Sequence, residues 1–256
     1  MTDLEIQSSE TITTVIPSSH EEAHAIKPGL TSIIVPVYNV NYPLFHYTGN
    51  CIGSIKEHTD APYEIVVVDN GSPIRPGKIQ EYNADKVIQN EENKGVAAAW
   101  NQGIRVSQGE YIVLLNNDTM VFDHWLSDML EALQKADLVM ATPMYGEAFS
   151  RAVEAAQKRK FWEGKQIEES FNGFRDFACV GMRRSLLEEI GTFDEQFFAY
   201  AEDLDFLRRM DKANKTYFSS KKINIFHIIG ATSTSLPETP ETMNESKEKL
   251  KAIWGE

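Results

Sequence analysis

The stretch Tyr63-Glu64-Ile65-Val66-Val67-Val68-Asp69 is a run of mostly β-branched residues that ends in an acid, and the turn residues Asn70-Gly71-Ser72-Pro73 follow it directly. Its apolar residues occupy consecutive positions rather than alternate ones, which is typical of a strand buried on both faces. Such strands occur mainly in parallel sheets that carry helices on both sides. The stretch therefore predicts a central strand of an α/β fold.

Similar runs lie before and after this strand along the chain. Thr31-Ser32-Ile33-Ile34-Val35-Pro36-Val37 precedes it and is closed by a proline and a valine. Lys86-Val87-Ile88-Gln89 is a weaker run, Glu110-Tyr111-Ile112-Val113-Leu114-Leu115 is a stronger one, and residues 137–142 form a fifth. These runs predict further strands of the same sheet.

Between the expected strands, apolar residues recur at helical spacing. One group comprises Val96, Trp100 and Ile104, and a second comprises Leu126, Met129, Leu130 and Leu133. The alternation of strands and helices predicts an open, doubly wound, mostly parallel sheet of the α/β class. In such a sheet the ligands bind beyond the carboxyl ends of the strands.

The 256 residues are enough for one large α/β domain or two small ones. Residues 1–29 are rich in Ser, Thr and Glu, so we expect a flexible extension, followed by the main domain over residues 30–235. Residues 236–256 form a charged tail in which we expect a short helix that docks on the domain. Residues 143–173 lack strand character and are interpreted as an insertion over the site, with a helix at residues 151–161.

Acidic residues outnumber basic ones, 38 against 25, and the formal net charge is -13 at pH 7. This balance argues against nucleic acid or an anionic membrane as the main partner, although peripheral contact with a membrane stays open. The two cysteines, Cys51 and Cys179, show no metal-ligand spacing and are expected to be reduced core thiols. No apolar run approaches the roughly 20 residues that span a bilayer, and residues 1–27 do not resemble a secretory signal, so we expect a cytoplasmic protein.

Polar residues gather where three of the expected strands end. Tyr38-Asn39 follows the first strand, Asp69-Asn70-Gly71-Ser72 closes the second, and Asn116-Asn117-Asp118-Thr119 follows the fourth. A single Asp after a strand is more often a turn residue or a helix cap. Because the ends of parallel strands meet at one edge, two carboxylates there, with glycine nearby, indicate a ligand site.

Six motifs, in their order along the chain, resemble those of family 2 glycosyltransferases with the GT-A fold. They are Ser32-Ile33-Ile34-Val35-Pro36-Val37-Tyr38-Asn39, Val67-Val68-Asp69-Asn70-Gly71-Ser72, Asn90-Glu91-Glu92-Asn93-Lys94-Gly95, Leu114-Leu115-Asn116-Asn117-Asp118-Thr119, Gly191-Thr192-Phe193-Asp194-Glu195 and Glu202-Asp203-Leu204-Asp205. Each motif alone is weak, but six in the family's order are specific. The resemblance covers about residues 31–230 and implies a Rossmann-like nucleotide-binding half followed by an acceptor-binding half.

The resemblance implies a nucleotide site at the strand ends. Asp69 matches the carboxylate that accepts a hydrogen bond from the imide N–H of uracil or thymine, and backbone groups of Pro36 and Tyr38 are expected beside the same base. Asn93 and Gly95 match the loop that passes the ribose and the diphosphate, where a side chain at position 95 would block close approach. A plain turn before a helix is the alternative for Gly95.

Asn116, Asn117 and Asp118 stand where the family carries its Asp-X-Asp metal motif, and Asn116 replaces the first acid. The resemblance implies that Asp118 binds Mn²⁺ or Mg²⁺, whereas Asn116 and Asn117 lie at the nucleotide, with Asn116 facing the ribose or a metal-bound water. An oxygen-rich site that bridges two phosphates suits either cation. His227 matches a late histidine that completes the metal shell in several branches of the family, and a purely structural histidine is the alternative.

Glu202 and Asp203 carry the catalytic hypothesis. The apolar residues in 206–210 predict a helix that begins here, and carboxylates in a first turn favour the helix, so capping is the alternative. The resemblance implies that Asp203 is the general base that deprotonates the acceptor hydroxyl, with Glu202 or Asp205 as the other candidates. The aromatic residues just before the pair are expected either in an acceptor pocket or in the core. They are Phe197, Phe198 and Tyr200.

These motifs predict an inverting glycosyltransferase that uses a UDP- or dTDP-sugar, a divalent cation and a glycan or glycolipid acceptor. The Asn116-Asn117-Asp118 variant resembles that of relatives which build rhamnose-containing and other bacterial surface glycans, an analogy alone. A sugar nucleotidyltransferase is the enzymatic alternative, but the sequence after the first strand lacks the Gly-rich loop with Arg and Lys that such enzymes carry. A degenerate member that binds nucleotide sugar or a partner protein without turnover is the non-enzymatic alternative. Only Asn116 favours it, and the Glu202-Asp203 pair argues against it.

Overall fold

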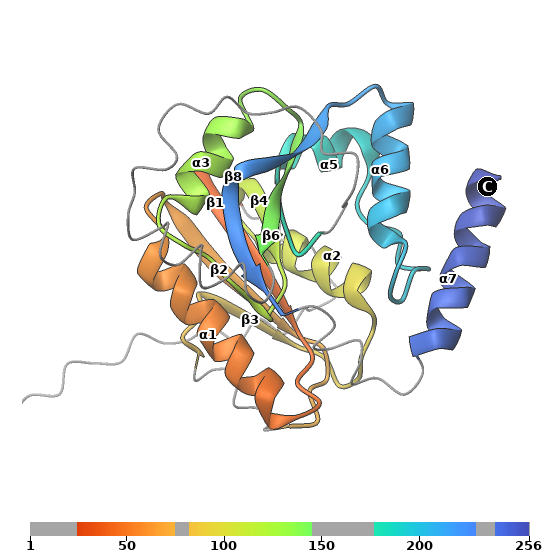
Figure 1. Cartoon of the computed structure of the whole chain (residues 1–256), viewed down its shortest axis with the longest axis horizontal. Coiled ribbons are helices and arrows are strands. Elements are labelled where there is room, and N and C mark those ends of the chain that lie inside the picture. The colour runs from red at the N-terminus through yellow and green to blue at the C-terminus, as the bar shows by residue number, and fades with distance from the viewer. Residues whose placement is uncertain (1–24, 75–81, 145–176, 229–238, 256) are drawn as a thin grey trace, which may run out of the picture.

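The computed structural model describes residues 25–74, 82–144, 177–228 and 239–255. In that part of the chain eight strands form one sheet in the order β3-β2-β1-β4-β7-β6-β8-β5 (Figure 1). The strands are β1 (Lys27–Val37), β2 (Tyr63–Asp69), β3 (Lys86–Gln89), β4 (Gly109–Leu115), β5 (Thr119–Met120), β6 (Leu138–Met144), β7 (Cys179–Arg183) and β8 (Tyr217–His227).

The half of the sheet whose strands end in the polar residues is parallel. β3, β2, β1 and β4 are parallel neighbours, and β6 and β8 are parallel to each other. β7 runs antiparallel between β4 and β6, and β5 runs antiparallel to β8 at the edge. The expected α/β class with an open, mostly parallel sheet is thereby confirmed.

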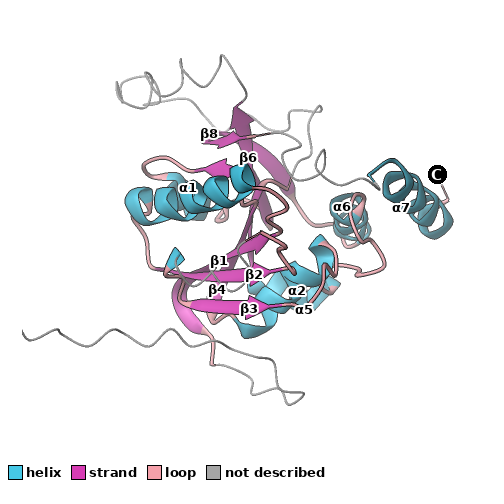
Figure 2. Cartoon of the chain, turned by 90° about the horizontal axis from the view of Figure 1, so that it is seen from below, coloured by secondary structure: helices cyan, strands magenta, loops and turns pink. Residues whose placement is uncertain are grey.

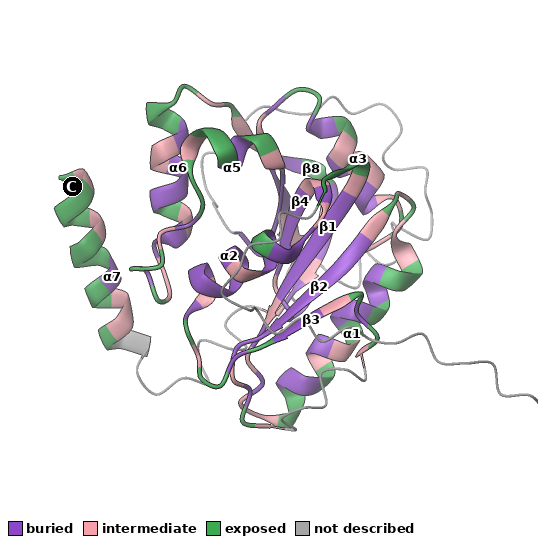
Figure 3. Ribbon diagram, turned by 180° about the vertical axis from the view of Figure 1, so that it is seen from behind, coloured by how far each residue is buried: buried purple, intermediate pink, exposed green. Residues whose placement is uncertain are grey.

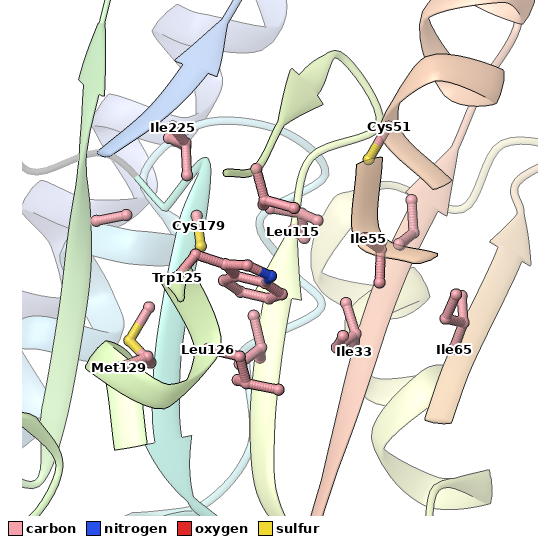
Figure 4. Packing of buried hydrophobic residues seen from close by; sticks show 14 of the residues in the cluster. Ile33, Cys51, Ile55, Ile65, Leu115, Trp125, Leu126, Met129, Cys179 and Ile225 are labelled. Carbon is pink, nitrogen blue, oxygen red and sulfur yellow. The ribbon is translucent and has the colours of Figure 1, made fainter. Parts of the chain in front are cut away.

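Helices cover both faces of this sheet. They are α1 (Tyr42–His58), α2 (Val96–Val106), α3 (Trp125–Ala132), α5 (Arg184–Ile190) and α6 (Glu202–Lys212), whereas α7 (Thr239–Trp254) lies apart from the sheet. Successive side chains of a strand point to opposite faces, so Ile33 of β1 joins a core with α1 and α3, whereas Ile34 joins a second core with α2, α5 and α6. Figure 4 shows the first core, where Trp125 of α3 and Ile55 of α1 lie over the strands.

The last helix, α7, lies outside α6 and away from the sheet in both Figure 1 and Figure 2. Figure 3 shows the contrast in burial, since the central strands are buried along most of their length and α7 is mostly exposed. Both cysteines are free and buried, as expected from the sequence. No helix in the described part of the chain is long and apolar enough to cross a lipid bilayer.

Among the elements that the sequence pattern did not predict are α1 and β7. In α1, Asn41 caps the first turn by accepting from Leu44 N at 2.9 Å, but Gly49 and Gly53 dilute the helical pattern. β7 has only 5 residues and reverses direction, which a short apolar run cannot reveal. The expected helix at residues 151–161 lies outside the described residues, as do the remainder of that insertion from residue 145 and the extension up to residue 24.

Close packing of α2 on β1 makes Gly103 a sensitive position. A Cβ atom at Gly103 would lie 2.4 Å from Cγ2 of Ile34, whereas a Cβ at Gly53 on the exposed side of α1 would meet nothing within 4 Å. We expect Gly103→Ala to lower the free energy of unfolding by about 1–3 kcal/mol because the added methyl overpacks the core.

The matched control, Gly53→Ala, should raise the free energy of unfolding by about 0.5–1 kcal/mol because alanine favours a helix over glycine. Urea denaturation of both variants measures the difference. Equal effects of the two substitutions would contradict the packing described for α2.

Candidate active site

Three polar segments share one edge of the sheet because the strands that carry them are parallel neighbours. Val37 at the end of β1 lies opposite Asp69 at the end of β2. Ile34 of β1 lies opposite Leu114 of β4, and Asn116 follows the end of β4 directly. Parallel pairing therefore places the ends of β2, β1 and β4 side by side.

A chain of hydrogen bonds runs along this edge from Asp69 to Asn117. Ser72 N donates to Oδ1 of Asp69 at 3.0 Å, and Asn39 N donates to Oγ of Ser72 at 2.8 Å. Oγ1 of Thr48 is 3.0 Å from Oδ1 of Asn39 and accepts from Nδ2 of Asn117 at 2.8 Å. All five residues are buried, so this chain fixes the end of β2 relative to the segment after β4.

Asp69 is a buried carboxylate that can accept more hydrogen bonds than Ser72 and Gln89 donate to it. Its Oδ2 atom accepts from Nε2 of Gln89 at 3.4 Å, in addition to the bond from Ser72. Burial raises the pKa of Asp69, and the hydrogen bonds from Ser72 and Gln89 oppose that shift. An ionised carboxylate accepts about four hydrogen bonds, so lone pairs are left for a ligand N–H. Pro36 and Tyr38 are half-buried at the end of the adjoining strand.

Asn70 ties the end of β2 to the loop before α2, a role that sequence reasoning missed. Its Nδ2 atom donates to Oδ1 of Asn93 at 2.8 Å and to the carbonyl oxygen of Gly95 at 3.1 Å. Its Oδ1 atom accepts from Nδ2 of Asn90 at 3.0 Å and from Lys94 N at 3.1 Å. Asn70 thus organises the loop that contains Asn93 and Gly95. Its position directly after Asp69, in the second motif, is the signal that points to it.

Gly95 lies where the backbone of a distant segment approaches α2. Its φ angle is +87°, and a Cβ atom there would lie 2.5 Å from the carbonyl oxygen of Phe198. Val96 N, at the start of α2, donates to that same oxygen at 3.0 Å. The group that requires glycine in this structure is therefore the Phe198 backbone, and the bond joins the loop before α2 to the segment that leads into α6.

Asp118 and His227 form a buried pair at the same end of the molecule. β5 pairs with β8 so that Thr119 lies opposite His227, and Ile228 N donates to the carbonyl oxygen of Asp118 at 3.0 Å. Oδ1 of Asp118 is 3.3 Å from Nε2 of His227, and the residues are 6% and 8% exposed. Two residues that are far apart in the sequence are thus brought together by one strand pairing.

The chemistry of this pair fits a divalent cation that is also bound by phosphate oxygens. The described residues contain no group of three or more His, Cys, Asp or Glu side chains placed to hold a metal ion. A carboxylate and an imidazole together supply a partial shell for Mn²⁺, and Mg²⁺ is often held by one or two carboxylates plus substrate phosphates. Asp118 and His227 therefore suit a metal that completes its shell with a ligand.

Glu202 and Asp203 begin α6 directly after a strained turn. Tyr200 and Ala201 have φ angles of 66° and 71°, and each such non-glycine residue costs about 1–2 kcal/mol. Glu202 is 9% exposed, and burial, with the neighbouring Asp203 carboxylate, raises the pKa of Glu202 to about 8. Asp203 is half-buried, and its Oδ1 accepts from Leu204 N at 2.7 Å.

The remaining candidates near this pair separate clearly by environment. Asp205 is buried, and its oxygens accept from Nε of Arg209 at 2.9 Å and from Nε1 of Trp254 at 3.0 Å, so it serves the structure. Phe197 is fully buried in the core. Phe198 is 40% exposed and remains available to a ligand.

The sequence profile of Glycosyl transferase family 2 matches residues 32–191 of this chain. Among curated proteins, the glycosyltransferase GlyG of Streptococcus pneumoniae serotype 4 is 32% identical over 113 residues, which cover 42% of this chain and 36% of GlyG. Residues 32–191, which match the family profile, run from β1 to the end of α5 and include Asp69, Asn70, Asn93, Gly95 and Asp118.

Solved structures of other proteins share the fold. The mannosyltransferase PcManGT of Pyrobaculum calidifontis, in complex with GDP-Man and Mn²⁺, has a TM-score of 0.60 at 19% identity, over 79% of this chain and 57% of that one. TarS of S. aureus, in complex with UDP-GlcNAc, has a TM-score of 0.57 at 19% identity, over 86% of this chain and 66% of that one. The chain therefore spans less than two thirds of the length of GlyG, PcManGT and TarS.

The buried Glu202 makes the free energy of unfolding depend on pH. Between the ordinary pKa of 4.5 and the raised value of about 8, the folded protein holds a proton that the unfolded chain has released. We therefore expect the free energy of unfolding to fall as pH rises through this window, by up to about 1.4 kcal/mol per pH unit. Below pH 4.5 and above pH 8, Glu202 should contribute no slope.

Comparing Glu202→Gln with the wild type by urea denaturation from pH 5 to pH 8 isolates this slope, which the variant should lack. Glu248→Gln, on the exposed side of α7, is the control and should keep it. Parallel curves for Glu202→Gln and wild type would show that the Glu202 carboxyl is not held protonated.

Proposed function

The chain belongs to glycosyl transferase family 2, and we propose that it transfers a sugar from a uridine or thymidine diphosphate sugar to a hydroxyl of a glycan or glycolipid, with inversion at the anomeric carbon. One observation carries the proposal. The buried pair of Asp118 and His227 lies 3.3 Å apart in the segments after β4 and at the end of β8, and hydrogen bonds lead from the adjoining Asn117 to Asp69.

Asp69 is the proposed reader of the donor base. A buried carboxylate with free lone pairs selects a ring that presents an N–H, and uracil and thymine both do so. TarS, which shares the fold, binds UDP-GlcNAc and supports a uridine donor, whereas PcManGT binds GDP-Man. Backbone groups of Pro36 and Tyr38 are proposed to flank the base, and the loop with Asn93 and Gly95 to pass the ribose and the diphosphate.

Asp118 and His227 are the proposed protein ligands of Mn²⁺ or Mg²⁺. When bound, the cation would offset the charge of the diphosphate and so favour its departure. PcManGT was solved with Mn²⁺, which supports a divalent metal in this fold. Asn116 and Asn117 supply neutral amides beside Asp118. We propose that Asn116 contacts the ribose or a metal-bound water, since Asn117 already donates to Thr48.

Asp203 is the proposed general base. It would accept the proton of the acceptor hydroxyl as that oxygen attacks the anomeric carbon on the side opposite the leaving diphosphate. Burial raises the pKa of its neighbour Glu202 to about 8, so near neutral pH Glu202 holds its proton, and the more exposed Asp203 is the base of the pair. Positioning both reactants in line is then the main contribution of the protein.

The acceptor side is proposed to include the exposed Phe198 ring, because an aromatic face packs against the apolar face of a sugar. A role in polysaccharide synthesis and a catalytic domain that ends near residue 235 belong to the same proposal. This domain begins with β1 at Lys27 and not at residue 30, because Lys27 already pairs with Gly109 of β4. A cytoplasmic location stays a prediction from the sequence. The match to the family decides against a sugar nucleotidyltransferase.

The base assignment predicts a loss of turnover without a loss of binding. We expect Asp203→Asn to lower kcat by at least about 100-fold while the dissociation constant of UDP stays within about twofold, because the base acts on the acceptor alone. Asp211→Asn, at the other end of α6, is the matched control and should keep wild-type turnover.

Steady-state kinetics gives kcat, and titration calorimetry gives the dissociation constant of UDP. Turnover near the wild-type value in Asp203→Asn would remove Asp203 as the base. Binding of UDP by the wild type, with no transfer or donor hydrolysis across a panel of donors and acceptors, would instead favour the degenerate member that Asn116 suggests.

The metal assignment predicts a loss of cation-dependent affinity. In the presence of Mn²⁺, we expect Asp118→Asn and His227→Gln each to raise the dissociation constant of UDP about tenfold or more, and tenfold corresponds to about 1.4 kcal/mol. The affinity of each variant should then approach that of the wild type without metal. Asp123→Asn, whose exposed carboxylate contacts His58, is the matched control and should bind like the wild type. Calorimetry with and without Mn²⁺ measures this, and an unchanged Mn²⁺ effect in both variants would place the metal elsewhere.

A further inference from the structure

The turn before α6 adopts a conformation that its residues disfavour. Tyr200 and Ala201 are consecutive non-glycine residues with φ angles of 66° and 71°. Residues in this region persist only where the surrounding structure holds them, and such sites cluster where function requires a fixed geometry. Glu202 and Asp203 follow immediately, so the direction of both carboxylates depends on this turn.

From the side of the sheet, α2 holds the segment that leads into the turn. Asn101 donates from Nδ2 to the carbonyl oxygen of Phe193 at 2.8 Å and accepts from Phe193 N at 3.1 Å. Val96 N donates to the carbonyl oxygen of Phe198 at 3.0 Å. The Phe193 ring stacks on Phe206 of α6, with ring centroids 4.5 Å apart.

From the opposite side, α7 holds the same segment both before and after the turn. Oγ of Ser246 donates to the carbonyl oxygen of Ala199 at 2.7 Å, just before the turn. Nε1 of Trp254 donates to Oδ1 of Asp205 at 3.0 Å, one helical turn beyond Glu202. Lys249 adds a bond from Nζ to the carbonyl oxygen of Gln196 at 2.9 Å.

The other described side chains of α7 contribute little to the hydrophobic core. Among the side chains of α7 that the structure describes, Ser246 alone is buried, at 2% exposed, and Ile253 is 48% exposed. A helix that served only to complete a hydrophobic core would bury an apolar stripe. The hydrogen bonds that Ser246, Lys249 and Trp254 donate instead reach residues 196–205, the segment that carries the strained turn.

We propose that α7 is a brace that holds the Tyr200–Ala201 turn and so directs Glu202 and Asp203 towards the acceptor, with Ser246 and Trp254 as positioning residues. The inference rests on the proposed function for its catalytic consequence, but the bracing itself is a property of the fold. Because Asp205 is shared between Trp254 and Arg209, the indole bond transmits the position of α7 to the first turn of α6. Neither Ser246 nor Trp254 is assigned a contact with substrate.

The test uses the full chain with conservative changes that remove single hydrogen bonds. Trp254→Phe removes the indole N–H and keeps an aromatic ring, and Ser246→Ala removes the hydroxyl. Ser246→Thr keeps a hydroxyl and should restore wild-type behaviour. Lys247→Ala and Glu248→Ala, on exposed positions of the same helix, are the matched controls.

Two readouts separate bracing from catalysis. In the double variant Ser246→Ala, Trp254→Phe, we expect amide hydrogen exchange in residues 199–205 to rise about tenfold or more, while the strands of the sheet keep their protection. We also expect kcat for sugar transfer to fall about 5- to 20-fold with the KM for the donor within about twofold, because the base is displaced while the donor site is intact.

Each outcome decides the proposal. Unchanged exchange in residues 199–205 would show that α7 does not brace the turn. Faster exchange with an unchanged kcat, or equal losses in the controls, would limit α7 to a structural role and overturn Ser246 and Trp254 as positioning residues. A wild type without any transfer would refute the proposed function, and the exchange measurement would still decide whether α7 braces the turn.

Discussion

In the parallel pairing of β2, β1 and β4, the strand ends at Asp69, Val37 and Leu115 come to one edge of the sheet, and side chains that would otherwise be turn residues meet there. The buried hydrogen bonds through Ser72, Asn39 and Thr48 convert that proximity into a fixed geometry. A buried polar chain of this kind is costly when one member is unpaired, so it specifies a single arrangement. Asp69, the proposed reader of the donor base, and the segment with Asp118 are therefore parts of one rigid unit.

The second half of the site depends on how α6 is attached to that unit. The segment before α6 reaches the loop before α2 through the bond between Val96 and Phe198, and the absence of a side chain at Gly95 allows that approach. A donor on the strand edge and an acceptor near Asp203 would thus be held by elements in direct backbone contact. The proposed acceptor site would give a function to the strained turn at Tyr200 and Ala201 beside it.

The sequence predicted the parts of the site that depend on local chemistry. Continuous apolar runs predicted β1, β2 and β4, and the acids after them predicted the strand edge. Long-range pairing was beyond the same reasoning: the approach of His227 to Asp118 depends on the register of β5 with β8. The sequence pointed to His227 as a partner of Asp118 only through the resemblance to the family, and it predicted neither β5 nor its register with β8.

Other features were hidden because one residue type serves several roles. Asn70 has the sequence context of a turn residue, yet its side-chain amide both donates and accepts hydrogen bonds that organise the loop at Asn93. Of two neighbouring aromatic residues, Phe197 is buried in the core and Phe198 is exposed. The sequence cannot tell them apart, because the path of the backbone decides which ring points into the core.

The central claim is that Asp69, Asp118, Asp203 and His227 surround one nucleotide and one metal ion. Paramagnetic broadening of backbone amide signals by Mn²⁺ in the presence of UDP, compared with Mg²⁺ and UDP, tests it most directly. We expect the strongest broadening near Asp118 and His227, with effects that extend to the start of α6 and decline towards Asp69. Broadening centred on another surface, or none in these segments, would contradict it.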